Sequence, residues 1–319
     1  MLSVEIELKL EVKPDAISAV RQQLFQFPHH YTSLQYLTNI YFETADNQLR
    51  RWDMGLRIRG FDGQYEMTMK TAGKVIGGLH QRPEFNVPLS EPVLELAQFP
   101  AHIWPENTNL VRLQSQLTEL FRTDFTREKW RVNYGQSDIE VVLDQGEIRS
   151  GNHADISPIC EFELELVSGN VSDILSLATK LASQNGLRLA NKSKAARGYA
   201  LAQDLVQQTV PCVLKEPEWQ QSVTGLLSEI LKQWQKQEES WLAGLPESKA
   251  ALSRVLDWVT QLSEKQSGGL PELALLPDLL PELAEALSAA DAESGKLCYS
   301  ALWLRCKLAL MQCLVMQSR

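Results

Sequence analysis

Polar and apolar side chains alternate in eight separate segments of the first 167 residues. The segments are 2–12, 36–43, 54–61, 64–71, 79–88, 125–133, 137–145 and 159–167. A period of two is typical of β-strands, because successive side chains point to opposite faces of a sheet. The turns Phe61-Asp62-Gly63-Gln64 and Tyr134-Gly135-Gln136 join consecutive segments as hairpins do, so neighbouring strands are predicted to be mostly antiparallel.

Helical patterns separate the predicted strands. They lie at about 14–27, 92–102, 109–122, 171–186 and 193–201, the last with Ser193 near its start. The string GKVIGG at 73–78 lacks the full spacing of a phosphate-binding loop and lies between two predicted strands. We therefore expect it to be a hairpin connection.

Charged side chains gather on one face of each predicted strand. In the first strand Glu5, Glu7 and Lys9 share a face, and the opposite face is apolar. The same division recurs in GLRIRG, YEMTMK and the later segments. A one-sided sheet with solvated charges would also alternate. However, eight strands match a barrel that encloses a small ligand, and the intervening helices are available to cover an apolar outer surface. An α+β fold with an eight-stranded antiparallel barrel and a charged interior is therefore predicted.

Such an interior would hold dense charge of both signs. Its eight predicted basic residues are Lys9, Arg57, Arg59, Lys70, Arg82, Arg127, Lys129 and Arg131. They face about ten acidic residues, and confined charges are costly unless they are paired or bound to a ligand. A polyphosphate with divalent cations meets both demands, because phosphoryl oxygens satisfy Arg and Lys while carboxylates hold hard cations.

The pattern changes after residue 218. A stripe with a period near 3.6, which runs from Trp219 to Trp234, predicts an amphipathic helix, and further helices are predicted at 247–266, 278–290 and 292–317. We therefore expect a barrel domain at 1–203, followed by an all-helical domain at 218–319.

Composition and motifs exclude several classes of function. The net charge of −9 disfavours a sequence-independent nucleic-acid binder, which needs a basic surface. Five cysteines without a CxxC pair are typical of reduced thiols in a cytoplasmic protein. The sequence shows neither a signal peptide nor an apolar run long enough for a membrane span, and it contains no GxSxG or HExxH string. Among the histidines, only His80 shares a face with a predicted interior residue, Arg82.

The order of the motifs resembles that of the CYTH, or triphosphate tunnel metalloenzyme, family. The string EIELK, which contains Glu5, Glu7 and Lys9, matches the family's ExExK signature. NIYFETADNQLRRWDMGLRIRG, YEMTMK, EVVLDQGEI, EFELEL and NKSKAARGY follow in the family's order. The resemblance covers residues 1 to about 201, and it identifies the chain as a member of this family.

The resemblance implies roles for individual residues. Those implied to bind metal are Glu5, Glu7, Glu161, Glu163 and Glu165. Those implied to bind substrate are Lys9, Arg57, Arg59, Lys70, Arg82, Arg127 and Lys129, with Lys194, Arg197 and Lys192 near one tunnel end. Catalysis would fall to Glu5, Glu7, Lys9 and Glu163, with Asp144 supporting the metal ligands or orienting water. The implied cofactor is Mg²⁺, for which Mn²⁺ can substitute.

The helical part resembles the opening of the CHAD domain that follows the tunnel in some inorganic triphosphatases. It departs from that pattern, since no histidine follows His153 and residues 204–319 hold ten Lys plus Arg against fifteen Asp plus Glu. It is also shorter than a full CHAD domain. We therefore expect a divergent or truncated appendage that serves packing, self-association or protein contact rather than polyphosphate binding.

The function that the sequence favours is metal-dependent hydrolysis of inorganic tripolyphosphate to phosphate and diphosphate. Two alternatives on the same fold are thiamine triphosphatase and class IV adenylate cyclase, which would need a pocket for an organic group at a tunnel mouth. A third alternative is a module that binds triphosphate or polyphosphate without turnover. No nucleic-acid or membrane partner is expected.

Overall fold

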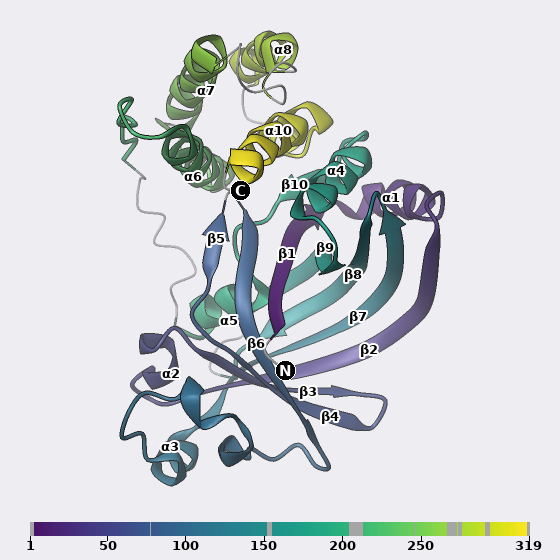
Figure 1. The fold of residues 1–319 in the computed structure, drawn as a ribbon, viewed down its shortest axis with the longest axis vertical. Helices are drawn as coiled ribbons and strands as arrows, with labels where there is room; N and C mark the ends of the chain where they lie inside the picture. The colour runs from purple at the N-terminus through teal and green to yellow at the C-terminus, as the bar shows by residue number, and fades with distance from the viewer. Residues whose placement is uncertain are drawn as a thin grey trace.

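The computed structural model describes residues 3–76, 78–151, 155–203, 213–245, 247–266, 273, 276–290 and 294–317. One sheet of ten strands dominates the first 189 residues (Figure 1). The strands are β1 (Ser3–Val12), β2 (His29–Glu43), β3 (Gly55–Phe61), β4 (Gln64–Lys70), β5 (Lys74–Ile76), β6 (Leu79–Leu89), β7 (Thr118–Tyr134), β8 (Ser137–Arg149), β9 (Ile156–Ser168) and β10 (Leu187–Leu189).

Eight of these strands form a closed antiparallel barrel, as predicted. Their order is β1-β9-β8-β7-β2-β3-β4-β6, and β6 pairs back onto β1 in the register Glu5↔Arg82. The short strands β5 and β10 extend the sheet beside β6 and β1. The β3–β4 hairpin turns through Asp62 and Gly63, whose φ angles of 49° and 74° are left-handed, as a tight hairpin turn requires.

Helices cover the outer surface of the barrel on one side. The helical elements of the barrel region are η1 (Pro14–Ala16), α1 (Ile17–Leu24), α2 (Gln48–Arg51), η2 (Leu96–Gln98), η3 (Ala101–Ile103), α3 (Leu110–Gln116), α4 (Val171–Leu181) and α5 (Lys194–Ala202). Val20 of α1 and Leu175 of α4 share a hydrophobic core with Leu8, Leu10 and Trp130 on the strands. The apolar strand faces therefore point outward, and the charged faces point inward.

Three predictions about local structure were wrong. The helix predicted at 109–122 ends at Gln116, because 118–122 belong to β7, where Phe121 stacks on Tyr41 of β2 with ring centroids 4.4 Å apart. The helix predicted at 92–102 is two short 3₁₀ turns instead. Strand β2 begins at His29, seven residues before the predicted start.

The C-terminal part is helical, as predicted. It contains α6 (Val223–Leu242), α7 (Glu247–Gln266), α8 (Leu276–Ala289), α9 (Ser294–Cys298) and α10 (Ala301–Gln317). The stripe predicted to start at Trp219 enters the helix only at Val223, because Ser222 caps α6 by accepting from the amide of Gly225. The helix predicted at 292–317 is divided into α9 and α10. None of the described helices combines the length and hydropathy of a membrane span.

The helical part and the barrel share one hydrophobic core. Leu8 and Leu189 of the barrel belong to the same buried cluster as Trp234 of α6 and Met311 of α10. Figure 1 shows α6 and α10 lying above β5, β10 and one end of β1. The predicted boundary at 204–217 falls between α5 and α6, and residues 204–212 lie outside the described part of the chain.

Candidate functional site

The barrel encloses a cavity of about 550 Å³, lined by side chains from the barrel strands and by the start of α5. Twelve of the residues implied as metal or substrate ligands line it, namely Glu5, Glu7, Lys9, Arg57, Arg59, Lys70, Arg82, Arg127, Lys129, Glu163, Glu165 and Lys194. His80 also lines the cavity. Asp144, Glu161 and Arg197 do not line it and lie beside its α5 end. Arg131 pairs with Asp138 and is 45% exposed, so its predicted interior position was wrong.

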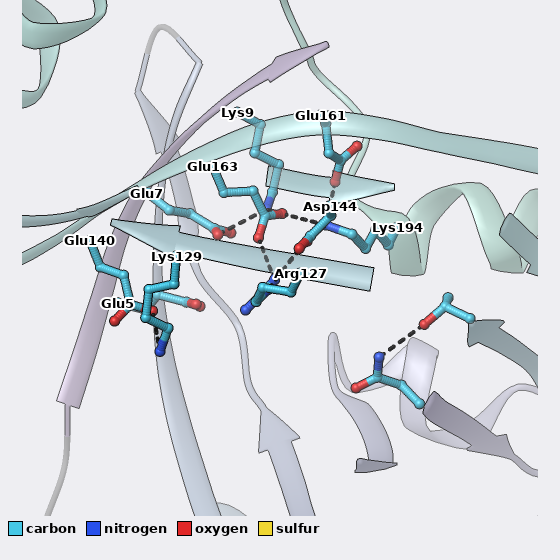
Figure 2. A network of polar contacts seen from close by, with 12 residues as sticks. Glu5, Glu7, Lys9, Arg127, Lys129, Glu140, Asp144, Glu161, Glu163 and Lys194 are labelled. Atoms are coloured by element: carbon cyan, nitrogen blue, oxygen red, sulfur yellow. Dashed lines mark hydrogen bonds and ion pairs between the residues drawn. The ribbon is translucent and has the colours of Figure 1, made fainter. Parts of the chain in front are cut away.

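Lys194 reaches from α5 into a buried group of three carboxylates (Figure 2). Its Nζ lies 2.6 Å from Asp144, 2.5 Å from Glu161 and 2.9 Å from Glu163. Ser193 holds the start of α5 by accepting from the amide of Ala196 at 3.1 Å. The three carboxylates are close enough together to hold a metal ion, but the ammonium group already lies among them.

Two arginines add further positive charge to this group. Arg127 donates to both oxygens of Asp144, at 2.7 and 2.6 Å, and Arg197 donates to Glu161 at 2.5 Å. Burial alone would raise the pKa of Asp144, but the charges of Arg127 and Lys194 outweigh it and hold the pKa below its ordinary value. Asp144 is therefore kept ionised, and each of the three carboxylates is paired with a cation of the protein itself.

Lys9 connects this buried group to the next carboxylate along β1. Its ammonium contacts Glu163 and lies 2.8 Å from Glu7. Burial opposes the charged form of Glu163, yet Lys194, Lys9 and Arg127 together lower the pKa of this carboxyl well below its usual value. Glu163 lies within ion-pairing distance of all three cations, so it is the acidic centre of the network in Figure 2.

Carboxylates are less completely neutralised farther along the same three strands, β1, β8 and β9. Lys70 contacts Glu5, and Lys129 lies 3.1 Å from Glu140. No described Lys or Arg lies within ion-pairing distance of Glu165. Burial, together with the negative charges of Glu5 and Glu140, raises the pKa of Glu165 to about 7. The carboxylates of Glu5, Glu140 and Glu165 together exceed the nearby positive charge, and such an environment attracts a hard divalent cation.

The opposite imbalance occurs on β3. Arg59 donates from Nε to Asn39 at 3.1 Å and has no carboxylate within ion-pairing distance among the described residues. Burial, together with the positive charges of Arg57 and Arg127, lowers the pKa of Arg59 to about 10. The nearest carboxylate to Arg57 is Glu84 at 3.7 Å, and its Nε has no partner in the described structure. These guanidinium groups are therefore available to an anion.

Sequence reasoning did not assign some residues that line the cavity. Asn39 and Tyr41 come from β2, whose strand was predicted without an assignment of its faces. The polar Asn39, two positions before Tyr41 and next to the apolar Ile40, was the signal that could have identified this face. Lys192, in contrast, lies outside the tunnel and pairs with Glu239 of α6 at 3.4 Å.

The sequence matches the CYTH domain family over residues 3–199, so the chain belongs to the CYTH family. It is similar to the inorganic triphosphatase of Haemophilus influenzae, with 39% identity over 204 residues that cover 62% of this chain and 54% of the relative. The chain therefore spans about half the length of this curated relative. The cytoplasmic location inferred from the cysteines stays a prediction.

Solved structures with similar folds include two described as candidate nucleotide cyclases. One, from Hippeastrum, is described as having a dominant triphosphatase activity and matches with a TM-score of 0.45 and 18% identity, covering 61% of this chain and 95% of that one. The other, from Bacillus halodurans, matches with a TM-score of 0.42 and 23% identity, covering 61% of this chain and 97% of that one.

Proposed function

We propose that the tunnel binds inorganic tripolyphosphate together with Mg²⁺ and hydrolyses it to phosphate and diphosphate. The observation that carries this proposal is the separation of charge across the cavity. Among the described residues, Arg59 has no carboxylate within ion-pairing distance and Arg57 has only Glu84 at 3.7 Å, whereas Glu165, on the other side, has no Lys or Arg within that distance. A polyanion that carries a divalent cation satisfies both sides at once. The similarity to an inorganic triphosphatase supports the same reaction.

The basic residues would hold the phosphate chain at several points. Arg57 and Arg59 offer planar guanidinium groups that bind phosphate oxygens in pairs. Lys9, Arg127 and Lys194 lie at the α5 end, where they can turn from their carboxylates to a terminal phosphate. The remaining proposed contacts nearer the mouths come from Lys70, Arg82 and Lys129. Because phosphoryl transfer depends on positioning and on charge neutralisation, this arrangement is itself the main source of catalysis.

The donor set fits Mg²⁺. Glu5, Glu7, Glu163 and Glu165 present carboxylate oxygens to the cavity from the adjacent strands β1 and β9, and Mn²⁺ favours the same ligands. When bound, such a metal supplies charge neutralisation and a water of lowered pKa. Glu161 and Asp144 would contribute indirectly, because their ion pairs hold Lys194 and Arg127 in position.

The direct test is phosphate release from tripolyphosphate, ATP and thiamine triphosphate, with and without Mg²⁺, measured by malachite green. We expect tripolyphosphate to be preferred and Mg²⁺ or Mn²⁺ to be required. Glu163→Gln should lower kcat by about a hundredfold, as the loss of a key electrostatic group does. Glu119→Gln, a change on the exposed start of β7, is the matched control and should leave kcat unchanged.

Three results would contradict the proposal. Binding of tripolyphosphate without phosphate release would identify a non-catalytic module. Formation of cyclic AMP from ATP would identify a cyclase. Preference for thiamine triphosphate would require a pocket for the organic group. Full activity of Glu163→Gln at saturating Mg²⁺ would remove this residue from the metal site.

A further inference from the structure

A buried ion network joins the barrel to the helical part at β10. Arg188 donates to Glu11 of β1 at 2.7 Å and to Glu238 of α6 at 3.2 Å. Glu238 is fully buried and also accepts from Trp303 at 2.8 Å and from Lys307 at 2.6 Å, both on α10. Buried charges are strongly disfavoured when one partner is missing, so these contacts fix β10 against α6 and α10.

The residues that follow Arg188 are held between α6 and β1. The amide of Ala190 donates to the carbonyl of Lys9 at 2.9 Å. Asn191 donates to Glu239 of α6 at 3.2 Å, and Lys192 lies 3.4 Å from the same carboxylate. Two adjacent residues of α6 therefore hold residues 188–192 in place. Glu238 binds Arg188 of β10, and Glu239 binds the segment between β10 and α5.

Residues 188–192, which α6 holds, are followed directly by Ser193 and Lys194. Lys194 follows Asn191 by three positions, a span of at most about 10 Å of chain, so a displacement of Asn191 is expected to shift Lys194 as well. Ser193 caps α5 at this point, and Lys194 is the first helical residue. The position of its ammonium among Asp144, Glu161 and Glu163 thus depends on where the segment before it is held.

A second contact places α6 beside the other side of the cavity. A Cβ added at Gly78, in the β5–β6 turn, would lie 3.2 Å from Gln235 of α6 and 3.4 Å from Met311 of α10. Lys74 and Val75 of the same hairpin line the cavity. The helices therefore contact two chain segments that contribute residues to the tunnel wall.

We propose that Glu238 and Glu239 are positioning residues of the tunnel. Through them, α6 holds residues 188–192 and thereby determines the position of Lys194. Neither residue lines the cavity, so both act through the segment that they hold. The appendage is then part of the functional unit rather than an independent module. The expected effect on turnover rests on the proposed function, whereas the expected effect on α5 does not.

The first experiment compares two glutamates of α6 by hydrogen exchange with mass spectrometry. Glu239→Ala removes the acceptor of Asn191, and Glu229→Ala is its matched control. Both side chains are 31% exposed, and within the described structure the ion pair and hydrogen bond of Glu229 are with Lys232 and Gln233 of its own helix. We expect the amides of α5 to exchange about threefold faster in Glu239→Ala, which is the effect of losing one hydrogen bond. The control should match the wild type, and peptides of α4 should not change in either variant.

The second experiment removes the buried link. Arg188→Met should raise the exchange rate of α5 at least tenfold and lower kcat for tripolyphosphate by a similar factor, since it cuts the contacts to Glu11 and Glu238. Arg188→Lys keeps one charge and should recover part of both effects. A variant that is merely less stable would instead show faster exchange in α4 and α5 alike.

The outcomes separate the two proposals. Equal exchange of α5 in Glu239→Ala and Glu229→Ala, with equal kcat, would overturn the positioning role even if Arg188→Met fails to fold. Failure of the wild type to hydrolyse tripolyphosphate would overturn the proposed function, and the exchange of α5 would still decide whether α6 holds this segment.

Discussion

Replacing Lys194 by Met tests the charge balance at the α5 end of the tunnel. The substitution removes an ammonium that lies within 3 Å of Asp144, Glu161 and Glu163. Each carboxylate keeps at least one other cation. Asp144 keeps Arg127, Glu161 keeps Arg197, and Glu163 keeps both Lys9 and Arg127. Loss of one partner from a buried ion network costs about 3–5 kcal/mol, and the remaining cations place this case near 3 kcal/mol.

The assay is thermal unfolding followed by differential scanning fluorimetry. A loss of about 3 kcal/mol lowers Tm by about 4–5 °C in a chain of this size. Lys180→Met, at an exposed position of α4, is the control and should change Tm by less than about 1 °C.

Divalent cations should distinguish the variant from the wild type. Without the ammonium, the three carboxylates can accept Mg²⁺ or Mn²⁺, and a ligand at ten times its Kd stabilises a protein by about 1.4 kcal/mol. The gain in Tm on adding metal should therefore be about 2 °C larger for Lys194→Met than for the wild type. An equal gain would mean that the place of the ammonium is not accessible to a cation.

The pH dependence has a defined sign. The folded-state pKa of Asp144 is lowered, so this carboxylate contributes stability above its unfolded pKa of about 3.8, and the contribution is lost as the pH falls. Lys194→Met raises that pKa and reduces the contribution at neutral pH. The difference in Tm between variant and wild type should therefore persist down to about pH 4 and narrow only as the pH falls below about 3.8. A Tm equal to that of the wild type at pH 7.5 would refute the whole reasoning.

Three further perturbations have expected outcomes. The raised pKa of Glu165, about 7, means that its folded state favours the proton, so the stability of the wild type should fall as the pH rises from about 4.5 to 7. Glu165→Gln should flatten the dependence of Tm on pH between about 4.5 and 7 in metal-free buffer. An unchanged slope would show that the titration of Glu165 is not its cause. Arg59→Met should leave Tm unchanged or higher, because it removes a buried charge without a carboxylate, but should raise KM for tripolyphosphate about tenfold in steady-state assays. Gly198→Ala should lower the free energy of unfolding by about 1–3 kcal/mol in urea titration, since its Cβ would lie 2.1 Å from the ring of Phe121; a stable variant would show that α5 can move away from β7.

The composition of the tunnel could be predicted from the sequence because the evidence for it is local. Glu5, Glu7 and Lys9 lie two positions apart, so they share one face of a strand. When the sheet closes into a barrel, the charged faces of all the strands turn to the same side, the interior. The start of β7 could not be predicted in this way. Its apolar residues continue the helical spacing of Leu113 and Leu117, and only pairing with β2 makes the segment a strand.

The ion pairs of the site could not be predicted, because they join residues far apart in the chain. Lys194 and Asp144 are 50 residues apart, and the contact exists only because α5 packs against the barrel at Phe121. The same holds for Arg188 and Glu238, which belong to parts that the sequence assigns to separate domains. Sequence patterns specify which face a charge occupies, whereas the fold decides which charges neutralise one another.

This distinction explains how an acidic protein can recognise a polyanion. The net charge of −9 repels phosphate at long range, but mobile ions screen that repulsion beyond about 8 Å at physiological ionic strength. Inside the tunnel the balance is set by neighbours within a few ångströms, where Asp144 and Glu161 are neutralised by protein cations while Arg59 is not. Recognition therefore depends on which charges the fold leaves without a partner, and any element that changes the pairing, including α6, changes the site.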